Sequence, residues 1–149
     1  MEQSQAHYGE GQQPGVELNR LLERIQVLLP LIRGWNPDVL VAVNSDGLVL
    51  AGILNQYLER EVRFLLVVEK DGVPEVIKDT CGRLGKKRVL LVAGRFSTEP
   101  SRDLVEERIR LKQPLSVVRM VGVGKGVEYS CFPEFPSHTP LPWEYHEIG

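Results

Sequence analysis

The sequence predicts an α/β fold, a doubly wound and mainly parallel sheet flanked by helices, from two observations. Short apolar runs rich in β-branched residues are bounded by turn residues, as expected of strands buried on both faces. Helical patterns alternate with these runs, and a strand–helix–strand unit with short links has parallel strands. The runs are 39–43, 62–68, 89–92 and 115–121.

The helices follow from apolar periodicity and from residues that begin or end helices. Apolar residues recur at helical spacing from Val16 to Ile32, and Gly34 ends this first helix. The second helix is apolar almost all round, as expected of a helix buried on two sides. The third is short and stops at Gly85, and Pro100 suits the first turn of the fourth. The expected helices span 16–34, 48–58, 73–84 and 101–112.

The segments between and after these elements are expected to be turns and an edge. Residues 44–47 form the turn after the first strand. Residues 122–126 form a glycine-rich turn, which we favour over a phosphate loop because its spacing differs from that of nucleotide-binding loops. Residues 127–132 pair back as an edge strand, and 132–149 is ordered but irregular.

Composition excludes several classes of protein. The 149 residues carry a formal net charge of −2 and a pI near 5.9, so we expect neither nucleic acid nor a membrane as a partner. With 42% hydrophobic residues, 16–149 suits one packed domain behind a disordered tail, 1–15. Cys81, Cys131 and the three histidines match no metal-ligand spacing. We therefore expect no metal, no cofactor and a reducing, cytoplasmic location.

Ligands of such sheets bind beyond the carboxyl ends of the strands, which directs attention to loops 44–47 and 93–101. Three blocks around these loops are distinctive. The first is Gly34-Trp35-Asn36-Pro37-Asp38 with strand 39–43 and Gly47-Leu48-Val49, the second is Gly85-Lys86-Lys87-Arg88 with strand 89–92, and the third is Pro142-Trp143-Glu144.

These blocks, in this order, resemble the type I phosphoribosyltransferases, and among them the prokaryotic purine (hypoxanthine, guanine or xanthine) enzymes. The likeness runs from about Leu18 to Glu144. It implies their fold and a place in purine salvage. It also implies phosphoribosyl pyrophosphate as substrate, Mg²⁺ as the metal of an active member, and frequent homodimers.

The sequence departs from the family where phosphates bind. The family's diphosphate loop has an arginine and two glycines, whereas this chain has Ser45-Asp46-Gly47, so that an aspartate would repel pyrophosphate. The family's substrate loop has two acids for the ribose, then aspartate-threonine-glycine-x-threonine around the 5′-phosphate. Laid on the same strand, this chain has Ala93 and Gly94 for the two acids, Ser97 for the third, and Glu99 for the glycine, with Thr98 and Ser101 retained.

Each departure weakens phosphoribosyl transfer for a physical reason. Ala93 and Gly94 have no side chain that can bond a ribose. Helix N-termini bind anions through free N–H groups, of which Pro100 removes one, and Glu99 competes with a phosphate for the same place. The span 69–88 is short for the mobile hairpin that closes over the family's reaction, and we interpret it as a plain connecting helix.

The candidate residues form two groups. The ligand-pocket candidates are Asn44, Ser45, Asp46, Gly47, Ala93, Gly94, Arg95, Phe96, Ser97, Thr98, Glu99 and Ser101. Aromatic residues in the segment that the resemblance assigns to purine recognition are candidates for stacking on a base, with packing of the proline-rich end as the alternative. They are Tyr129, Phe132, Phe135 and Trp143.

Three hypotheses about function follow. The first is a phosphoribosyltransferase-like domain without catalysis, a pseudoenzyme that acts as a binding, regulatory or assembly module, as a homodimer or with a protein partner, and with a phosphosugar or nucleotide as possible ligand. The second is an active purine phosphoribosyltransferase that uses Ser97, Thr98, Ser101 and Mg²⁺. The third is another enzyme that uses Asp46 and Glu99 as its carboxylates.

Overall fold

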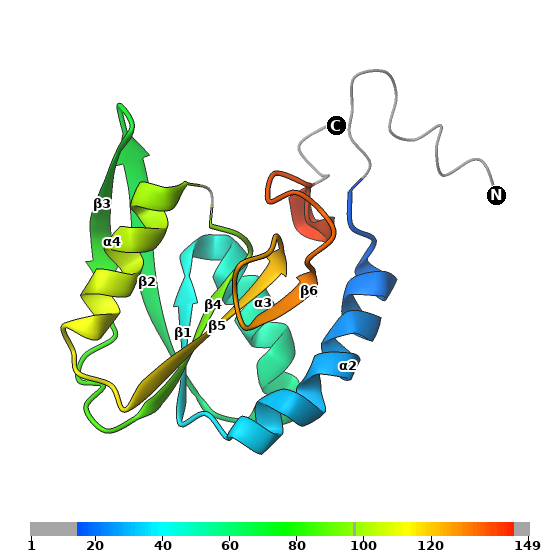
Figure 1. Cartoon of the computed structure of the whole chain (residues 1–149), viewed down its shortest axis with the longest axis horizontal. Coiled ribbons are helices and arrows are strands. Elements are labelled where there is room, and N and C mark those ends of the chain that lie inside the picture. The colour runs from blue at the N-terminus through cyan, green and yellow to red at the C-terminus, as the bar shows by residue number, and fades with distance from the viewer. Residues whose placement is uncertain (1–14, 97, 145–149) are drawn as a thin grey trace.

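The computed structural model describes residues 15–96 and 98–144 (Figure 1). The expectations for residues 1–14, Ser97 and residues 145–149 lie outside the described part. The strands are β1 (Val39–Val43), β2 (Glu61–Lys70), β3 (Val73–Asp79), β4 (Arg88–Ala93), β5 (Ser116–Val123) and β6 (Tyr129–Phe132). The helices are α2 (Leu18–Trp35), α3 (Asn44–Leu58), α4 (Glu99–Arg110) and the short 3₁₀ helix η1 (Pro142–Glu144).

The strands form one six-stranded sheet in the order β3-β2-β1-β4-β5-β6. The pairs β1–β2, β1–β4, β4–β5 and β5–β6 are parallel, and only β2–β3 is antiparallel. The predicted fold class, a mainly parallel α/β sheet, is therefore confirmed. In such a sheet the carboxyl ends of β1, β4 and β5 share one edge, which brings the loops after them together.

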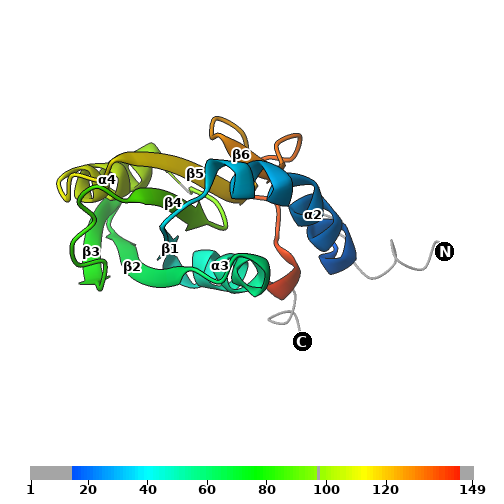
Figure 2. The same cartoon turned by 90° about the horizontal axis from the view of Figure 1, so that it is seen from below.

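Helices cover both faces of the sheet (Figure 2). Helix α4 lies on one face and α3 on the other, with α2 beside β6. Strand β1 is buried along its whole length, and its side chains alternate between the two cores with the period of 2 that a strand imposes. Leu40 and Ala42 join the α2–α3 core, whereas Val39, Val41 and Val43 join the α4 core. Burial of these side chains on both faces, at about 25 cal/mol per Å² of apolar surface, holds the layers together.

The expected helix over 73–84 is wrong: residues 73–79 form strand β3, antiparallel to β2. Asp71 and Gly72 link the two strands, with φ of 54° and 79°. Positive φ at both central residues is what a two-residue hairpin turn of type I′ requires, and Asp-Gly is a favoured pair there. The span 69–88 therefore contains a β-hairpin strand rather than a connecting helix, and the β-branched residues of 73–77 suit a strand better than a helix.

Two further expectations need correction. Residues 44–47 are the first turn of α3 rather than a separate turn, so the chain passes from β1 straight into a helix. Strand β6 does not pair back antiparallel but runs parallel to β5, with Met120 opposite Tyr129. The outer edge of β6 is covered by α2, whose Arg24 donates from Nη1 to the Cys131 carbonyl at 2.6 Å. None of the helices in the described part is both long and apolar enough to cross a membrane.

Candidate functional site

The loops after β1, β4 and β5 meet at one end of the sheet, together with the segment 133–144, which we call the strap (Figure 1). The strap begins after β6 and passes the loop 94–98 on its way to η1. Its Leu141 is fully buried among the loops: the Leu141 Cδ1 atom lies 2.9 Å from where a Cβ on Gly94 would be, and Cδ2 lies 3.0 Å from that of Gly122. The strap is therefore packed onto the carboxyl ends of the strands.

The first turn of α3 is shaped by packing as well as by its polar groups. Asn44 has a left-handed φ of 61°, and its Oδ1 accepts a hydrogen bond from the Val67 N–H at 2.8 Å, which ties the turn to β2. Gly47 is buried, and a Cβ there would lie 2.4 Å from the carbonyl oxygen of Val92 on β4. The glycine is thus required by the close approach of α3 to β4, independently of any ligand. Ser45 is exposed.

Arg95 organises the centre of the site. Its guanidinium donates to Asp46 Oδ2 at 3.1 Å and to both carboxylate oxygens of Glu144, at 2.6 and 3.0 Å. It also donates to the carbonyl oxygens of Ser137 and Thr139, at 2.6 and 3.0 Å. These bonds link the loop after β4 to the turn of α3 and to the strap. We call Arg95, Asp46, Glu144 and Trp143 the Arg95 cluster.

Trp143 completes the cluster, since its indole Nε1 donates to Asp46 Oδ1 at 2.9 Å. Both carboxylate oxygens of Asp46 therefore accept hydrogen bonds from this chain. The hydrogen bonds from Arg95 to Glu144 raise the pKa of the guanidinium despite its burial. Burial works to raise the pKa of Glu144, but the bonds from Arg95 and from the Leu141 N–H outweigh it and hold that pKa below its ordinary value. Both pKa shifts favour the charged forms, so Arg95 and Glu144 interact as an ion pair with charge-assisted hydrogen bonds.

Ala93 and Gly94, at the end of β4, offer no polar side chain where the resemblance implies ribose-binding acids. Ala93 is buried. A Cβ on Gly94 would lie 2.4 Å from the Cβ of Asp46, so the absence of a side chain at 94 is what lets Asp46 approach this strand. The two departures from the family pattern, Gly94 and Asp46, are thus physically coupled.

The N-terminus of α4 holds a carboxylate from another element. Thr98 caps the helix, its Oγ1 accepting from the Ser101 N–H at 3.2 Å. The hydroxyls of Thr98 and Ser101 both donate to one oxygen of Glu69, the first at 2.6 Å, the second by a shorter contact. These two bonds lower the pKa of Glu69. A helix N-terminus favours such a negative charge.

Glu99 does not occupy this position. Its side chain is 80% exposed and makes a 3.6 Å ion pair with Arg102, one turn further along α4. Sequence reasoning singled out Glu99 and missed Glu69, because the hairpin that carries Glu69 was expected to lead into a helix. The signal that was available is the position of Glu69 at the carboxyl end of a parallel strand, where ligand-binding groups gather.

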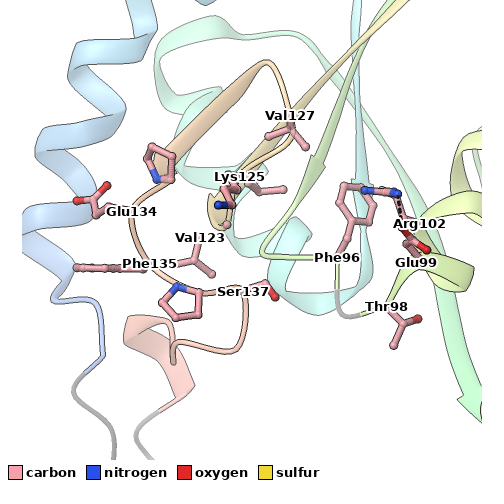
Figure 3. A pocket seen from close by; sticks show the side chains of 14 residues that line it. Phe96, Thr98, Glu99, Arg102, Val123, Lys125, Val127, Glu134, Phe135 and Ser137 are labelled. Carbon is pink, nitrogen blue, oxygen red and sulfur yellow. Dashed lines mark ion pairs between the residues drawn. The ribbon is translucent and has the colours of Figure 1, made fainter.

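Phe96 divides the space around these loops into two cavities. On one side lies a cavity of about 540 Å³ (Figure 3), whose walls include Val123, Lys125, Phe135 and Ser137. On the other lies a cavity of about 260 Å³ that Asn44, Glu69, Arg95 and Ser101 line. Phe96 lines both. The larger cavity therefore opens toward the strap and the smaller toward the β2–β3 hairpin.

The four aromatic candidates are not brought together around one cavity. Phe132 is buried and stacks on Phe135, with ring centroids 5.1 Å apart and planes at 4°. The guanidinium of Arg24 lies over the Phe132 ring at 4.4 Å. Tyr129 packs partly buried against the core beside α2, and Trp143 belongs to the Arg95 cluster. Of the four, only Phe135 lines the larger cavity.

The residues present do not fit the Mg²⁺ that the resemblance implies for an active member. Across 15–96 and 98–144, no group of three or more His, Cys, Asp or Glu side chains is placed to hold a metal ion. Carboxylates and carbonyls are the ligands that Mg²⁺ prefers. Here Ala93 and Gly94 supply no side-chain oxygen, and the oxygens of Asp46 already accept bonds from Arg95 and Trp143.

Comparison with known proteins identifies the fold. No protein-family model matches the chain, and no curated protein matches it. Among solved structures, a purine phosphoribosyltransferase from Pyrococcus horikoshii matches with a TM-score of 0.76 and 20% identity over 87% of this chain and 92% of that one. A hypoxanthine-guanine phosphoribosyltransferase from Bacillus anthracis matches with a TM-score of 0.68 and 16% identity, over 80% of each chain.

A hypoxanthine phosphoribosyltransferase from Staphylococcus aureus also matches, with a TM-score of 0.67 and 13% identity over 76% of this chain and 73% of that one. These likenesses confirm the fold that the sequence blocks implied. The chain has the type I phosphoribosyltransferase-like fold.

Proposed function

We infer that this protein is a phosphoribosyltransferase-like domain that no longer catalyses phosphoribosyl transfer and instead binds a small ligand or a protein. One observation carries the inference. At both loops that the resemblance assigns to phosphates, the chain holds a carboxylate of its own: Asp46 at the turn of α3 and Glu69 at the N-terminus of α4.

The electrostatics support this inference. A carboxylate at a phosphate position repels an incoming phosphate and takes the hydrogen-bond donors that the phosphate needs. Thr98 and Ser101 direct their hydroxyls to Glu69, and the strap covers the turn of α3 through Arg95 and Trp143. With no acids at 93 and 94, the ribose of phosphoribosyl pyrophosphate gains no compensating bonds.

The cavity beside Phe96 indicates the class of ligand. Val121, Val123 and Val127 give it an apolar floor, and Phe135 presents a ring whose neighbour, Phe132, holds it in place. Lys125 projects there without a hydrogen-bond or ion-pair partner among the described residues. This lining, apolar at its floor and charged at Glu99, Arg102 and Lys125, suits a flat base that stacks on Phe135 and carries polar groups at its edge, rather than a phosphosugar.

One observation favours the alternative of an active enzyme. The hydroxyls of Thr98 and Ser101 converge on one point at a helix N-terminus, as an anion site requires, and Glu69 stands on a hairpin that approaches from outside. If the hairpin withdraws, that site is free for a phosphate. The third hypothesis lacks comparable support, because Asp46 and Glu99 have separate partners, Arg95 with Trp143 and Arg102 respectively.

A transfer assay separates the first two hypotheses. The purified chain is incubated with phosphoribosyl pyrophosphate, Mg²⁺ and guanine, hypoxanthine or xanthine, with an active purine phosphoribosyltransferase as positive control. We expect no nucleotide. Nucleotide formation that Thr98→Ala or Ser101→Ala abolishes would establish the active alternative.

Ligand binding is tested separately by ligand-observed NMR with guanine, xanthine and ribose 5-phosphate. We expect a base to bind and ribose 5-phosphate not to bind, with binding lost in Phe135→Ala. Tyr57→Ala is the matched control, because Tyr57 is an exposed aromatic on α3 outside the cavity. Binding of the sugar phosphate but not of a base would contradict the proposed ligand class.

A further inference from the structure

The end of the sheet opposite the candidate site is basic, although the chain as a whole carries a net charge of −2. Four of the six residues from 83 to 88 are cationic and none is acidic: Arg83, Lys86, Lys87 and Arg88. Across the described residues, none of these four side chains forms an ion pair. The Arg88 guanidinium donates to the Trp35 carbonyl at 3.1 Å, and the Arg88 backbone N–H donates to Asp38 Oδ2 at 2.8 Å.

A second cationic segment lies against the first. The end of α4 and the link to β5 contribute Arg108, Arg110 and Lys112. The Leu115 N–H donates to the Lys87 carbonyl at 2.8 Å, which joins the two segments (Figure 1). We call residues 83–88 and 108–115 together the basic end. Among its acidic neighbours, Asp79 and Glu107 pair with cations of the second segment, Glu61 pairs with Arg63, and Asp38 accepts from the Arg88 N–H.

The basic end also carries apolar surface and a cavity. Leu111 and Leu115 are 65% and 63% exposed. Beside them a cavity of about 440 Å³ lies between α4 and β5, with Ile109, Pro114 and Val117 as its apolar lining. That volume falls within the roughly 300–1,000 Å³ of ordinary ligand sites.

The charged groups that line this cavity are paired with other residues of the chain, Arg110 with Glu107 at 2.7 Å. Arg119 pairs with Glu106 at 2.8 Å and with Glu128 at 3.1 Å. An occupant therefore gains apolar contact inside the cavity and meets unpaired cations outside it, on segment 83–88.

We propose that the basic end docks a short acidic segment of a partner protein, which places one apolar side chain in the cavity between Ile109 and Val117. Acidic residues of the segment meet Lys86 and Lys87, and complementary charge speeds and orients such an encounter. The surface is distinct from the candidate site, which lies at the other end of the strands, and the proposal is independent of the function proposed there.

Two other anionic partners fit this surface less well. Proteins that bind single-stranded nucleic acid stack its bases on aromatic side chains, and neither the basic end nor the cavity lining contains an aromatic residue. A lipid surface binds apolar side chains that project into it, but it does not fill a concavity. A peptide uses both the cations and the cavity.

The experiment measures fluorescence anisotropy of a labelled peptide of alternating aspartate and glutamate with two central leucines. The comparison probes are the same peptide with serines for the leucines, poly(U) RNA, and phosphatidylserine vesicles. We expect the leucine peptide to bind most tightly, with an affinity that falls as salt rises. The charge-reversed variant Lys86→Glu/Lys87→Glu is expected to bind at least tenfold more weakly, and Val117→Ser, in the lining of the cavity, is expected to lose the preference for leucine over serine.

The matched control is Lys70→Glu/Lys78→Glu, which makes the same change of charge on the β2–β3 hairpin and is expected to bind as the wild type does. Circular dichroism verifies that each variant folds. Equal loss of binding in the two charge-reversed variants, or tighter binding of RNA or vesicles than of the leucine peptide, would overturn the proposal. So would the absence of peptide binding at low salt, or a self-association of the chain that Lys86→Glu/Lys87→Glu removes.

Discussion

The two loops that the family uses for phosphate both hold a carboxylate of this chain, and they hold it in different ways. Asp46 is fixed by Arg95 and Trp143, inside a cluster that also anchors the strap. Glu69 is held by two hydroxyls at the exposed N-terminus of α4, and it comes from the rim of a hairpin. The Asp46 carboxylate is bound inside a packed cluster of the domain, whereas the Glu69 carboxylate is bound at its surface.

Under the proposed function, the difference separates two ways in which a carboxylate can fill a phosphate position of this fold. At the turn of α3 the carboxylate is coupled to packing, since Gly94 admits Asp46 and Leu141 packs against Gly94. No single substitution there restores a phosphate site without disturbing the strap. At α4 the hydroxyls remain and only Glu69 stands in the way, so the same account predicts that this half is recoverable.

Arg95→Ala is expected to have the largest effect. It leaves Asp46 and Glu144 without their cation, and removal of one partner from a buried pair costs about 3–5 kcal/mol. Because the Arg95 side chain keeps 16% exposure, we expect the free energy of unfolding to fall by about 2–4 kcal/mol, measured in urea. The control, Arg102→Ala, removes a surface pair with Glu99 and is expected to cost about 1 kcal/mol or less. Equal losses in the two variants would show that the Arg95 cluster is not structural.

Gly47→Ala is expected to come next. The new Cβ would lie 2.4 Å from the backbone oxygen of Val92, which cannot move aside, and overpacking of this kind costs about 1–3 kcal/mol. Gly52→Ala in the same helix is the control, since nothing lies within 4 Å of its Cβ. Alanine is the better helix former by about 1 kcal/mol, so this control is expected to be neutral or stabilising. If Gly47→Ala is tolerated as well, the glycine is not needed for packing.

The pH dependence of stability is expected to report on Glu144. Its pKa in the folded chain is held below the value in the unfolded chain, so its contribution is fully present above about pH 4.5 and is lost as the pH falls through the folded pKa. In Glu144→Gln, urea unfolding is therefore expected to lose less stability between neutral and acid pH than in the wild type. Glu17→Gln, at an exposed residue whose side chain does not cap α2, is expected to keep the wild-type profile.

Glu69→Gln is expected to have the smallest effect on folding and a specific effect on binding. The side chain lies at the surface, so the unfolding midpoint is expected to change little. In this variant a neutral amide replaces the carboxylate, so a phosphate is no longer repelled and, as the charged acceptor, competes successfully for the hydroxyls of Thr98 and Ser101. Inorganic phosphate is therefore expected to raise the melting temperature of Glu69→Gln and not that of the wild type or of Glu75→Gln, a neighbouring glutamate on β3. A phosphate response in the wild type would show that Glu69 does not block this site.

The sequence was most informative where local chemistry decides the structure. The continuous apolar runs of β1 and β4 are buried on both sides, which leaves little room for another arrangement. The expectation of burial on two sides is wrong for α3, which buries one face and leaves Leu48 and Val49 46% and 41% exposed. Strand β3 was missed because Val73, Val76 and Ile77 fit a helical spacing, although Asp71-Gly72 indicated a hairpin. The error also hid Glu69, since a residue that leads into a helix is not expected at the rim of a site.

The site depends on contacts between residues that are far apart in the sequence. Trp143 and Asp46 are 97 positions apart, and Arg95 and Asp46 are 49 apart. The sequence places Asp46 and Arg95 in two loops that the structure brings together, but it does not indicate that they pair, and for Trp143 it leaves open stacking on a base or packing of the proline-rich end. Periodicity and turn signals carry no information on such pairs, because contacts between distant residues depend on how the strap packs over the loops.

The most direct test of the central claim, that carboxylates of the chain occupy both phosphate positions, is a calorimetric titration of the wild-type protein with phosphoribosyl pyrophosphate and Mg²⁺. We predict no heat of binding at millimolar concentrations of the sugar diphosphate, under conditions where an active purine phosphoribosyltransferase saturates. Saturable binding by the wild type, with one site per chain, would contradict the claim.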